Sequence, residues 1–344
     1  MFLVRASFLQ QAGTQKKMKL VVIIPCLNEE ATLADVISHI PSRISAITSA
    51  ETIVLDDGST DNSSSVAHKV GAKVISNGNN RGLGYTFKHG IETALASNAD
   101  VIVNMDGDGQ FNPQDIPRLV LPITEGKADF VTASRFKDAE QVPEMPKVKL
   151  WGNKVMSRMV STMVGQHFDD VSCGFRAYSR EAALRLNLWG KFTYTQESFL
   201  DLAVKEMRIV EVPVNVLGVR PVGESRIASN LWKYAARTAS ILFRSYRDYW
   251  PMHFFLWVAS PFAVISVLLL SFFLLHYFMT GSFSPHLWAG FSGGACLALA
   301  GGLLFAGFFA DMFKRIRLNQ EQIVYLSRKK IATETQHQNQ NTAD

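Results

Sequence analysis

The sequence predicts an α/β unit with a mostly parallel sheet, followed by an amphipathic interfacial helix and two transmembrane helices. Short apolar runs alternate with amphipathic segments over the first part of the chain, as in strand and helix units that build a parallel sheet. No Asp, Glu, Lys or Arg occurs from Pro251 through Ala310, a stretch long enough for two membrane helices of about 20 residues each. This stretch explains why 47% of the 344 residues are hydrophobic and only 19% are charged.

The expected strands and helices follow in order. Amphipathic helices are expected over about Ala31–Ile40, over Ser63–Val70 and up to Leu95. The apolar runs expected to form strands are Lys19–Pro25, Thr52–Leu55, Ala72–Ser76, the run that begins at Val101, and Ala128–Ala133.

The chain divides into five expected segments. They are a flexible extension at 1–18, the α/β unit at 19–228, the interfacial segment at 229–250, the membrane hairpin at 251–312, and a basic then polar tail at 313–344. The composition of the tail from Ala332 to Asp344 predicts disorder. Met18 is a second candidate for the start of translation.

Acidic and glycine-rich residues follow the expected strands. Because ligands of open α/β sheets bind at the carboxyl ends of the strands, Pro25, Asp57, Arg81 and the segment from Asp106 to Gln110 are expected to converge on one crevice. The sequence therefore predicts a single ligand site at this edge.

Asp106, Asp108 and Gln110 form the candidate metal site. They alternate with glycines directly after a strand, so in extended chain they point the same way. Carboxylate and amide oxygens suit Mg²⁺ or Mn²⁺, which keep positions for phosphate oxygens. The alternative is an Asp/Gly turn that only joins two elements.

The motifs of two common nucleotide sites are absent. The residues after the first strand read Pro-Cys-Leu-Asn-Glu-Glu, where a nicotinamide site requires G-x-G-x-x-G, and the chain has no Walker A lysine loop. An acidic crevice with a metal between it and a pyrophosphate fits a nucleotide-diphosphate donor.

The C-terminal part predicts a membrane protein with two spans, at about Phe254–Phe278 and Leu287–Phe309. Arginines precede the first span and Lys314, Arg315 and Arg317 follow the second, whereas the connecting loop has no basic residue. By the positive-inside rule, the α/β unit and both termini are expected in the cytoplasm. Three cysteines are too few for a disulfide framework, which agrees with a reducing compartment.

Two further segments indicate which partners the protein binds. Residues 231–249 mix aromatics and arginines at helical spacing, which favours an interfacial helix over the alternative of a core helix with a polar face. In the second span, small residues recur every four positions, which indicates packing against the first span or homo-oligomer formation; they are Gly290, Gly294, Ala298, Gly302 and Ala306. A net charge of +5 without an aromatic-interleaved basic patch favours anionic lipid over nucleic acid as the partner.

Eight short segments form an ordered set of motifs. They are Val22-Ile-Ile-Pro25-Cys-Leu-Asn28-Glu29-Glu30, Asp56-Asp57-Gly58-Ser59-Thr60-Asp61, Gly82-Leu-Gly84, Asp106-Gly-Asp108-Gly-Gln110, Ser134-Arg135-Phe136, Gly174-Phe175-Arg176, Glu211-Val-Pro213 and Arg220-Pro-Val-Gly223-Glu-Ser225-Arg226. As a set, these motifs resemble family 2 glycosyltransferases, and more closely the dolichyl- or polyprenyl-phosphate mannosyl- and glucosyltransferases that carry a membrane hairpin. The resemblance covers roughly Lys19 to Arg226 and implies the Rossmann-like GT-A fold. Two departures are Asp106-Gly-Asp108, where those enzymes have D-A-D, and Tyr194-Thr-Gln-Glu197, where only Glu197 matches Q-x-E.

The resemblance implies roles at the donor end. Asp57 would accept from the ring N–H of the base, although a helix N-cap is its alternative, and Asp106 would face the ribose or the sugar. Catalytic roles are implied for Asp106, Asp108, Arg135 and Glu197. The implied nucleotide-binding residues are Pro25, Asn28, Glu29, Asp56, Asp57, Arg81 and Asp106.

At the acceptor end, a phosphate monoester is already largely dianionic at neutral pH. It therefore needs cationic side chains to bind it and no general base. Arg220, Ser225 and Arg226 are placed to grip a lipid phosphate, with Arg176 as a further candidate. The alternative for these arginines is a surface ion pair. Asp170 could orient sugar hydroxyls or be a buried network carboxylate.

The function expected from these residues is metal-dependent, inverting transfer of a hexose from a UDP- or GDP-sugar to a polyprenyl phosphate such as dolichyl or undecaprenyl phosphate. Two alternatives stay open. A polysaccharide-synthesising membrane glycosyltransferase would need further spans and a Q-x-x-R-W segment. A non-catalytic membrane scaffold with a transferase fold would be expected to have lost its metal-binding residues.

Overall fold

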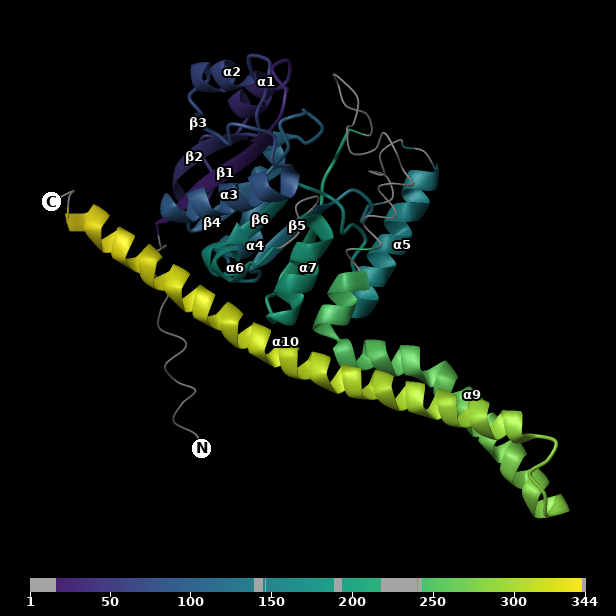
Figure 1. The fold of residues 1–344 in the computed structure, drawn as a ribbon. Coiled ribbons are helices and arrows are strands. Elements are labelled where there is room, and N and C mark those ends of the chain that lie inside the picture. The colour runs from purple at the N-terminus through teal and green to yellow at the C-terminus, as the bar shows by residue number, and fades with distance from the viewer. Residues whose placement is uncertain are drawn as a thin grey trace, which may run out of the picture. The chain divides into compact units, whose positions relative to one another are not determined.

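The computed structural model describes residues 17–138, 145, 147–188, 194–217, 240 and 243–341. The chain forms two compact units, the first comprising Met1–Ala236 with Tyr325–Asp344 and the second Arg237–Val324. The elements of the first unit (Figure 1) are β1 (Met18–Cys26), α1 (Leu33–Ser38), β2 (Ile47–Asp56), α2 (Ser63–Lys69), β3 (Lys73–Ser76), α3 (Leu83–Ala96), β4 (Val101–Asn104), η1 (Pro113–Asp115), α4 (Ile116–Thr124), β5 (Phe130–Ser134), α5 (Lys147–Val164), β6 (Arg176–Ser179), α6 (Arg180–Arg185), α7 (Thr195–Val204), β7 (Ile209–Pro213) and the last part of α10 (Leu287–Asn341).

Within the described residues, seven strands form one mixed sheet in the order β3-β2-β1-β4-β6-β5-β7. The first four are parallel, and Pro25 of β1 lies opposite Leu55 of β2. Among these seven strands only β6 is antiparallel to its neighbours, β4 and β5, whereas β5 and β7 are parallel. The predicted α/β class with a mostly parallel sheet is confirmed, and all five expected strands are present.

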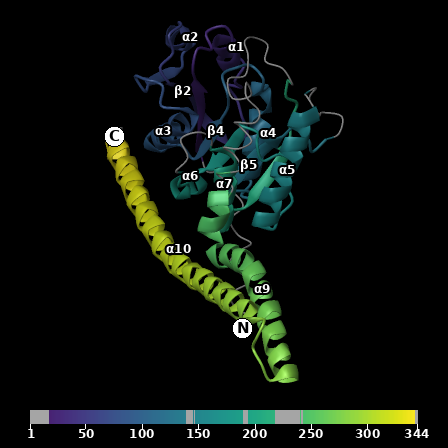
Figure 2. The same cartoon turned by 45° about the vertical axis from the view of Figure 1, so that its right-hand side comes forward.

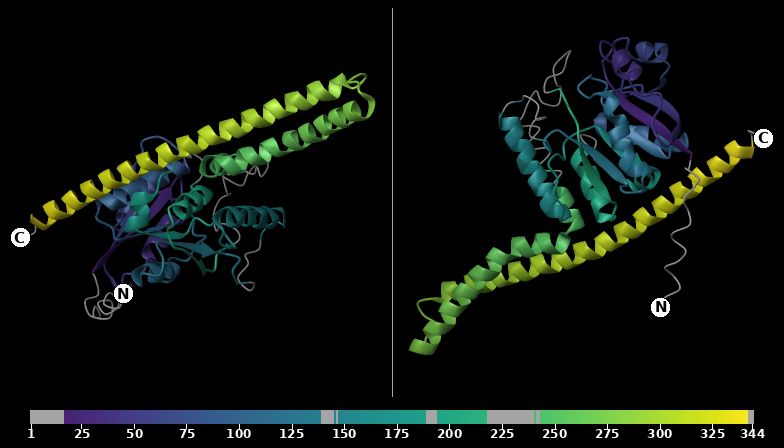
Figure 3. Two further views of the ribbon diagram at one scale, coloured as in Figure 1. Left: turned by 90° about the horizontal axis from the view of Figure 1, so that it is seen from below. Right: turned by 180° about the vertical axis from the view of Figure 1, so that it is seen from behind.

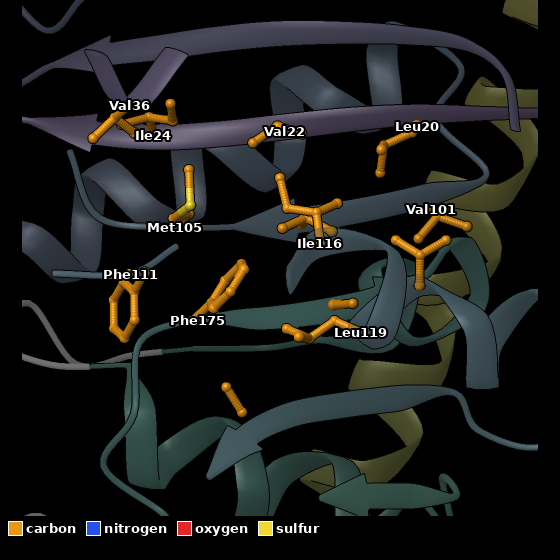
Figure 4. Packing of buried hydrophobic residues seen from close by; sticks show 14 of the residues in the cluster. Leu20, Val22, Ile24, Val36, Val101, Met105, Phe111, Ile116, Leu119 and Phe175 are labelled. Carbon is orange, nitrogen blue, oxygen red and sulfur yellow. The ribbon is translucent and has the colours of Figure 1, made fainter. Parts of the chain in front are cut away.

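Both faces of the sheet are buried, which explains why the strands are continuous apolar runs. Leu20, Val22 and Ile24 of β1 face α1 and α4, where they pack in one cluster with Ile116 and Phe175 (Figure 4). On the opposite face, Gly90 of α3 lies so close to β1 and β2 that an added Cβ would be 3.1 Å from Ile23 Cδ1 and 3.2 Å from Leu55 Cδ2. A side chain at position 90 would therefore force Ile23 and Leu55 to shift by a few tenths of an ångström.

The second unit contains a helical hairpin of α9 (Pro251–Thr280) and the first part of α10, which run side by side in Figure 3. Both helices are long and apolar enough to cross a membrane, which agrees with the two predicted spans. The expected break between them is present, because α9 ends at Gly281 with a left-handed φ of 70°.

The small residues of α10 only partly face α9. A Cβ on Gly290 would lie 2.9 Å from the Phe273 ring, and Ser266 Oγ donates to the carbonyl of Gly293 at 2.8 Å, so this end packs against α9. Gly294 and Gly302 have no heavy atom within 4 Å of an added Cβ. Homo-oligomer formation through this stripe stays a prediction.

The disorder expected after Ala332 is wrong as far as Asn341, because α10 continues to that residue. No Gly or Pro interrupts the chain from Asp311 to Asn341, and pairs such as Arg317 with Glu321, at 2.9 Å, support the helix at the i,i+4 spacing. The prediction of disorder rested on the polar composition of the tail and did not take this helical propensity into account.

The last part of α10 packs within the first unit against α6. Tyr325, which is buried, donates to Glu181 Oε1 at 2.8 Å, and Arg328 Nη1 donates to the carbonyls of Leu184 at 3.3 Å and Leu186 at 3.0 Å. These carbonyls belong to the C-terminal end of α6, where a cation is favoured by the helix dipole.

Candidate functional site

A cavity of about 190 Å³ opens at the carboxyl ends of β1, β2 and β4. The chain leaves β1 toward β2 on one side, whereas β4 lies on the other, so the strand order reverses at this point, as it does at ligand sites of open α/β sheets. The cavity is lined by Pro25, Cys26, Leu27, Glu29, Asp57, Asn80, Gly82, Leu83, Thr86, Asp106, Gly107 and Asp108.

The loop after β1 is joined to the loop after β2 by hydrogen bonds. Asn28 Oδ1 accepts from the backbone N–H of Thr60 at 2.7 Å, and the N–H of Glu29 donates to Ser63 Oγ at 2.9 Å. Pro25 and Glu29 line the cavity, as expected, whereas Asn28 is exposed and does not. In this structure Asn28 therefore holds the two loops together.

The two carboxylates after β2 have different surroundings. Asp56 accepts from the N–H of Ser59 at 2.8 Å and from Ser64 Oγ at 2.7 Å. Burial alone would raise the pKa of Asp56, but these hydrogen bonds outweigh it and hold the pKa below its ordinary value. Asp56 does not line the cavity. Its hydrogen bonds stabilise the turn that carries Asp57, which does line it.

Asp57 lines the cavity and also orders its opposite wall. Its carboxylate accepts from the backbone N–H groups of Arg81 and Gly82, each at 2.9 Å, and from Asn77 Nδ2 at 3.0 Å. The N-cap position of α2 is Asn62, so the N-cap alternative for Asp57 does not apply. Only the backbone of Arg81 takes part, because its side chain is exposed and donates to Tyr85 Oη at 3.0 Å.

Gly58 allows the two walls to approach each other. It has a φ of +84°, and an added Cβ would lie 2.9 Å from the backbone of both Asn79 and Asn80. Any other residue would be strained and would collide with the loop that Asp57 holds.

Asp106 and Asp108 lie on the same cavity, directly after β4. Asp108 is 2% exposed, and its Oδ1 accepts from the N–H of Gln110 at 3.0 Å, which fixes the turn. Gln110 is not part of the cavity lining, and its Nε2 donates to the carbonyl of Leu217 at 3.0 Å. The structure thus brings together two of the three expected metal ligands.

Two carboxylates on one cavity fit a divalent cation of the Mg²⁺ type. Such an ion binds to proteins through one or two carboxylates and completes its shell with water and substrate phosphates. Within the described ranges, no group of three or more His, Cys, Asp and Glu residues is placed to hold a metal. Asp106 and Asp108 would therefore hold the ion together with oxygens from the ligand.

Gly174 fits tightly against Asp106. An added Cβ would lie 3.1 Å from Asp106 Oδ2 and 3.2 Å from Tyr194 Oη. Tyr194 is fully enclosed, and its ring stacks on Phe87 at 3.9 Å between centroids. Burial, and then the charge of Asp106, raise the pKa of Tyr194 well above its ordinary value. Gly174, Tyr194 and Phe87 do not line the cavity but lie behind Asp106. Sequence reasoning assigned no role to Phe87 or Tyr194.

Arg135 at the end of β5 is paired with Asp170. Its Nε donates to Asp170 Oδ2 at 2.6 Å and its Nη2 to Asp170 Oδ1 at 2.9 Å and to Ser172 Oγ at 2.7 Å. Burial alone would raise the pKa of Asp170, but the charge and hydrogen bonds of Arg135 outweigh it and lower the pKa. Asp170 is fully buried, so of its two predicted roles the buried network carboxylate fits the structure.

Arg176 does not lie where an acceptor phosphate could reach it. The residue is fully buried, and its guanidinium donates to Ser198 Oγ and to three backbone carbonyls at 2.7 to 3.0 Å, those of Cys173, Thr195 and Val171. Sequence reasoning assumed that an arginine remains near solvent unless it meets a carboxylate. Here backbone carbonyls disperse its charge, and the residue fixes α7 to the loop before β6.

The remaining expected residues are placed as follows. Glu197 lies in the first turn of α7 and is 8% exposed, and its catalytic role stays a prediction. Arg220, Ser225 and Arg226 lie outside the described residues, as does most of the expected interfacial segment at 229–250.

Thr86 lines the cavity without having been expected. It accepts from Asn77 Nδ2, and its position one helical turn after Gly82 was the signal that could have found it.

Comparison with known proteins gives one family and several relatives. Residues 21–186 match the model of glycosyl transferase family 2. An uncharacterised glycosyltransferase of Mycobacterium bovis is 32% identical over 61% of this chain and 90% of its own length. A UDP-N-acetylglucosamine–dolichyl-phosphate N-acetylglucosaminyltransferase of Methanococcus voltae is 29% identical over 57% of this chain and 84% of its own. The polyprenol monophosphomannose synthase of Mycolicibacterium smegmatis is 26% identical over 65% and 88%.

Solved structures share the fold. Glucosyl-3-phosphoglycerate synthase of Mycobacterium tuberculosis, in complex with Mn²⁺, UDP-glucose and phosphoglyceric acid, superposes with a TM-score of 0.52 at 23% identity. The superposition covers 66% of this chain and 79% of that one.

Proposed function

Because the chain belongs to glycosyltransferase family 2, we propose that it transfers a hexose from a UDP- or GDP-sugar to a polyprenyl phosphate, with the catalytic unit on the cytoplasmic side of a membrane. The observation that carries this proposal is that Glu29, Asp57, Asp106 and Asp108 line one and the same cavity. The names of two relatives, which specify dolichyl phosphate and polyprenol monophosphomannose, support the lipid acceptor. The two apolar helices support a substrate in the bilayer.

At the donor end, different residues of the cavity would bind the nucleoside and the metal ion. Pro25 and Glu29 would line the pocket for the nucleoside. Asp57 would face the base, and its carboxylate also holds the loop of Arg81 and Gly82 in place. Asp106 and Asp108 would hold Mg²⁺ or Mn²⁺, either of which would neutralise the charge that builds up on the leaving nucleoside diphosphate. This electrostatic stabilisation is the main catalytic effect that we expect.

Arg135 acts indirectly in this proposal. Its pairing with Asp170 fixes the loop from Asp170 to Gly174, and Gly174 abuts Asp106. We therefore assign Arg135 as a positioning residue for the metal-binding carboxylate. Glu197 is retained as a candidate to orient the sugar.

At the acceptor end, the phosphate needs no general base, because its second pKa of about 6 makes it largely dianionic at neutral pH. Arg220, Ser225 and Arg226 are our candidates to bind it, on the strength of their sequence. Direct attack of phosphate on the anomeric carbon is a single displacement, so an α-linked donor would give a β-linked lipid phosphosugar.

The experiment incubates the full chain, reconstituted in lipid vesicles with polyprenyl phosphate, with a panel of radiolabelled UDP- and GDP-hexoses. We expect one of them to yield a labelled lipid, and we expect EDTA to abolish the product. Absence of a labelled lipid with every donor would contradict the acceptor class, and absence of donor hydrolysis as well would favour the scaffold alternative. Retention of the donor's anomeric configuration would contradict the single displacement.

Variants separate the two ends of the site. Asp108→Ala should lower kcat by about 100-fold or more, since it removes a carboxylate that would hold the ion. Asp35→Ala, at an exposed carboxylate of α1 outside the cavity, is the matched control and should keep full activity. Arg226→Ala should raise the KM for the lipid and leave that for the nucleotide sugar unchanged.

The proposed topology has its own test. A cysteine introduced at Ser282, between the two apolar helices, should react with a membrane-impermeant maleimide added to intact cells. A cysteine at Asp35 should react only after the membrane is opened. The reverse pattern would place the catalytic unit outside the cytoplasm.

A further inference from the structure

The outer face of α5 is apolar. Trp151, Val155 and Met159 recur at every fourth residue, so they lie on one side of the helix, and Trp151 is 69% exposed. The opposite side of α5 is inside the unit, where Ser157 and Val160 are buried. A row of large apolar side chains on an exposed helix face marks an interaction surface more often than chance exposure.

The same helix is strongly basic. Over its 18 residues α5 has four basic residues, Lys147, Lys149, Lys154 and Arg158, and no acidic residue. Lys154 and Arg158 are exposed and adjoin the apolar row at the i,i+3 spacing, from Trp151 and Val155. Neither of them forms an ion pair with another residue of the described ranges. The face thus combines an exposed tryptophan with uncompensated positive charge.

The inner side of α5 is hydrogen-bonded to the loop that supports the site. Asn153 Oδ1 accepts from Ser172 Oγ at 3.1 Å, and Ser172 Oγ in turn accepts from Arg135 Nη2 at 2.7 Å. Ser157 Oγ donates to the carbonyl of Asp169 at 2.9 Å. Figure 2 shows α5 at the margin of the first unit, next to α7 and β5.

We propose that this face, formed by Trp151, Lys154, Val155, Arg158 and Met159, docks on anionic lipid headgroups at the surface of the bilayer. Aromatic and aliphatic side chains on one face and cations beside them are the composition of helices that lie in the headgroup layer. The two apolar helices of the same chain keep a bilayer within reach. A second copy of the chain is a poor occupant, because it would bring the same positive charge to the contact.

Docking would hold α5, and through Asn153 the loop of Arg135 and Asp170, at the height of the lipid phosphates. This consequence rests on the proposed function, whereas the docking itself does not. The test therefore measures the depth of α5 in the bilayer and uses no enzymatic activity.

The experiment places a spin label on a cysteine at position 151 in the full chain, with Cys296→Ala, so that Cys26 and Cys173, both buried, are the remaining natural thiols. The protein is reconstituted in vesicles of phosphatidylcholine with phosphatidylglycerol and in vesicles of phosphatidylcholine alone. Oxygen, which dissolves in lipid, and a water-soluble nickel complex then compete to relax the label. In the anionic vesicles we expect the label at 151 to be accessible to oxygen and protected from nickel.

Two comparisons make the result specific. A label at Val70, exposed at the end of α2, should stay accessible to nickel in both kinds of vesicle. Exchanging Lys154 and Arg158 for glutamate should expose the label at 151, because each lost cation lowers the ratio of docked to undocked protein by about fivefold. A second label, at Val155, gives the same readout should the variant at 151 fail to fold.

Three results would overturn the proposal. The label at 151 could be as accessible to nickel in anionic vesicles as the label at Val70. Its protection could be unchanged by the glutamate substitutions, which would exclude anionic headgroups as the partner. Spin–spin broadening between labels on different copies would identify a second copy as the occupant.

Discussion

Exchanging Asp170 for asparagine should destabilise the first unit, because it removes the charge from a buried ion pair and keeps the shape of the side chain. Asp170 has no exposed surface, and the Arg135 side chain is 14% exposed. Asp170 Oδ2 accepts from Arg135 Nε at 2.6 Å and from its backbone N–H at 3.3 Å. An amide nitrogen at this position cannot accept, so both donors would lose their partner.

The magnitude follows from the burial of the pair. Removing one charge of a buried ion pair costs about 3–5 kcal/mol, because the partner charge stays in the interior without compensation. For a unit of this size, 1 kcal/mol corresponds to about 2–4 °C in Tm. We therefore expect Asp170→Asn to lower the Tm by about 6–20 °C, measured by differential scanning fluorimetry of the full chain in detergent.

The chain offers a matched control in Asp129 and Arg208. Arg208 Nε and Nη2 donate to the two oxygens of Asp129 at 2.9 Å each, and the backbone N–H of Arg208 donates at 3.0 Å. The geometry resembles that of the buried pair, but the Arg208 side chain is 56% exposed. Asp129→Asn should change the Tm little, because solvent screens an exposed pair. Equal shifts for the two variants would refute the argument from burial.

The pH dependence has a defined sign. Because the pKa of Asp170 is lowered in the folded protein, its contribution to stability is fully present above its unfolded pKa of about 3.9 and is lost as the pH falls through the folded value. The difference in Tm between wild type and Asp170→Asn should therefore be constant near pH 7 and shrink below about pH 4. A difference that grows on acidification would contradict the assigned direction of the pKa.

Three further outcomes are expected. Gly174→Ala should lower kcat by about threefold or more, because its Cβ would displace Asp106 and Tyr194 by a few tenths of an ångström, and misplacing a catalytic group by 1 Å costs about 100-fold; Gly152→Ala, with open space around its Cβ, should leave kcat unchanged. Arg328→Ala should free the end of α10 for limited proteolysis, at a cost of about 1–2 kcal/mol, whereas Lys330→Ala, at an exposed position, should not. Burial raises the pKa of Cys26 to about 11 and that of Cys173 to about 12, so maleimide at neutral pH should label neither in the folded protein, as mass spectrometry would show.

The half of the sheet that could be predicted from the sequence, β1 to β4, is the half in which local residue patterns determine the strands. β1 to β4 are apolar runs flanked by helices, and their carboxyl ends carry the residues that line the cavity. Parallel strands joined by right-handed crossovers leave few alternatives for where Asp57 and Asp106 must lie. The position of the cavity could be inferred from these rules without any coordinates.

The other half of the sheet depends on contacts between residues far apart in sequence. β6 has only four residues and pairs antiparallel with β4, which it follows by more than 70 residues. Nothing in the local pattern around Arg176 indicates that its guanidinium will be enclosed by carbonyls of Val171, Cys173 and Thr195. A charged residue is buried only when the fold supplies such acceptors, and those acceptors are backbone atoms that every sequence has.

The same reasoning explains why Arg135 and Arg176 could not be distinguished in advance. Both belong to short motifs at the ends of strands, Arg135 directly after β5 and Arg176 at the start of β6. Arg135 was a candidate for catalysis and Arg176 for binding the acceptor phosphate. In the structure each instead fixes a segment of the first unit: Arg135 holds the loop that ends at Gly174 beside Asp106, and Arg176 holds the first turn of α7, which carries Glu197. The placement of Asp106 and that of Glu197 therefore depend on two arginines that do not line the cavity, so variants of either should lose turnover together with thermal stability. A variant of a true phosphate ligand would lose turnover alone.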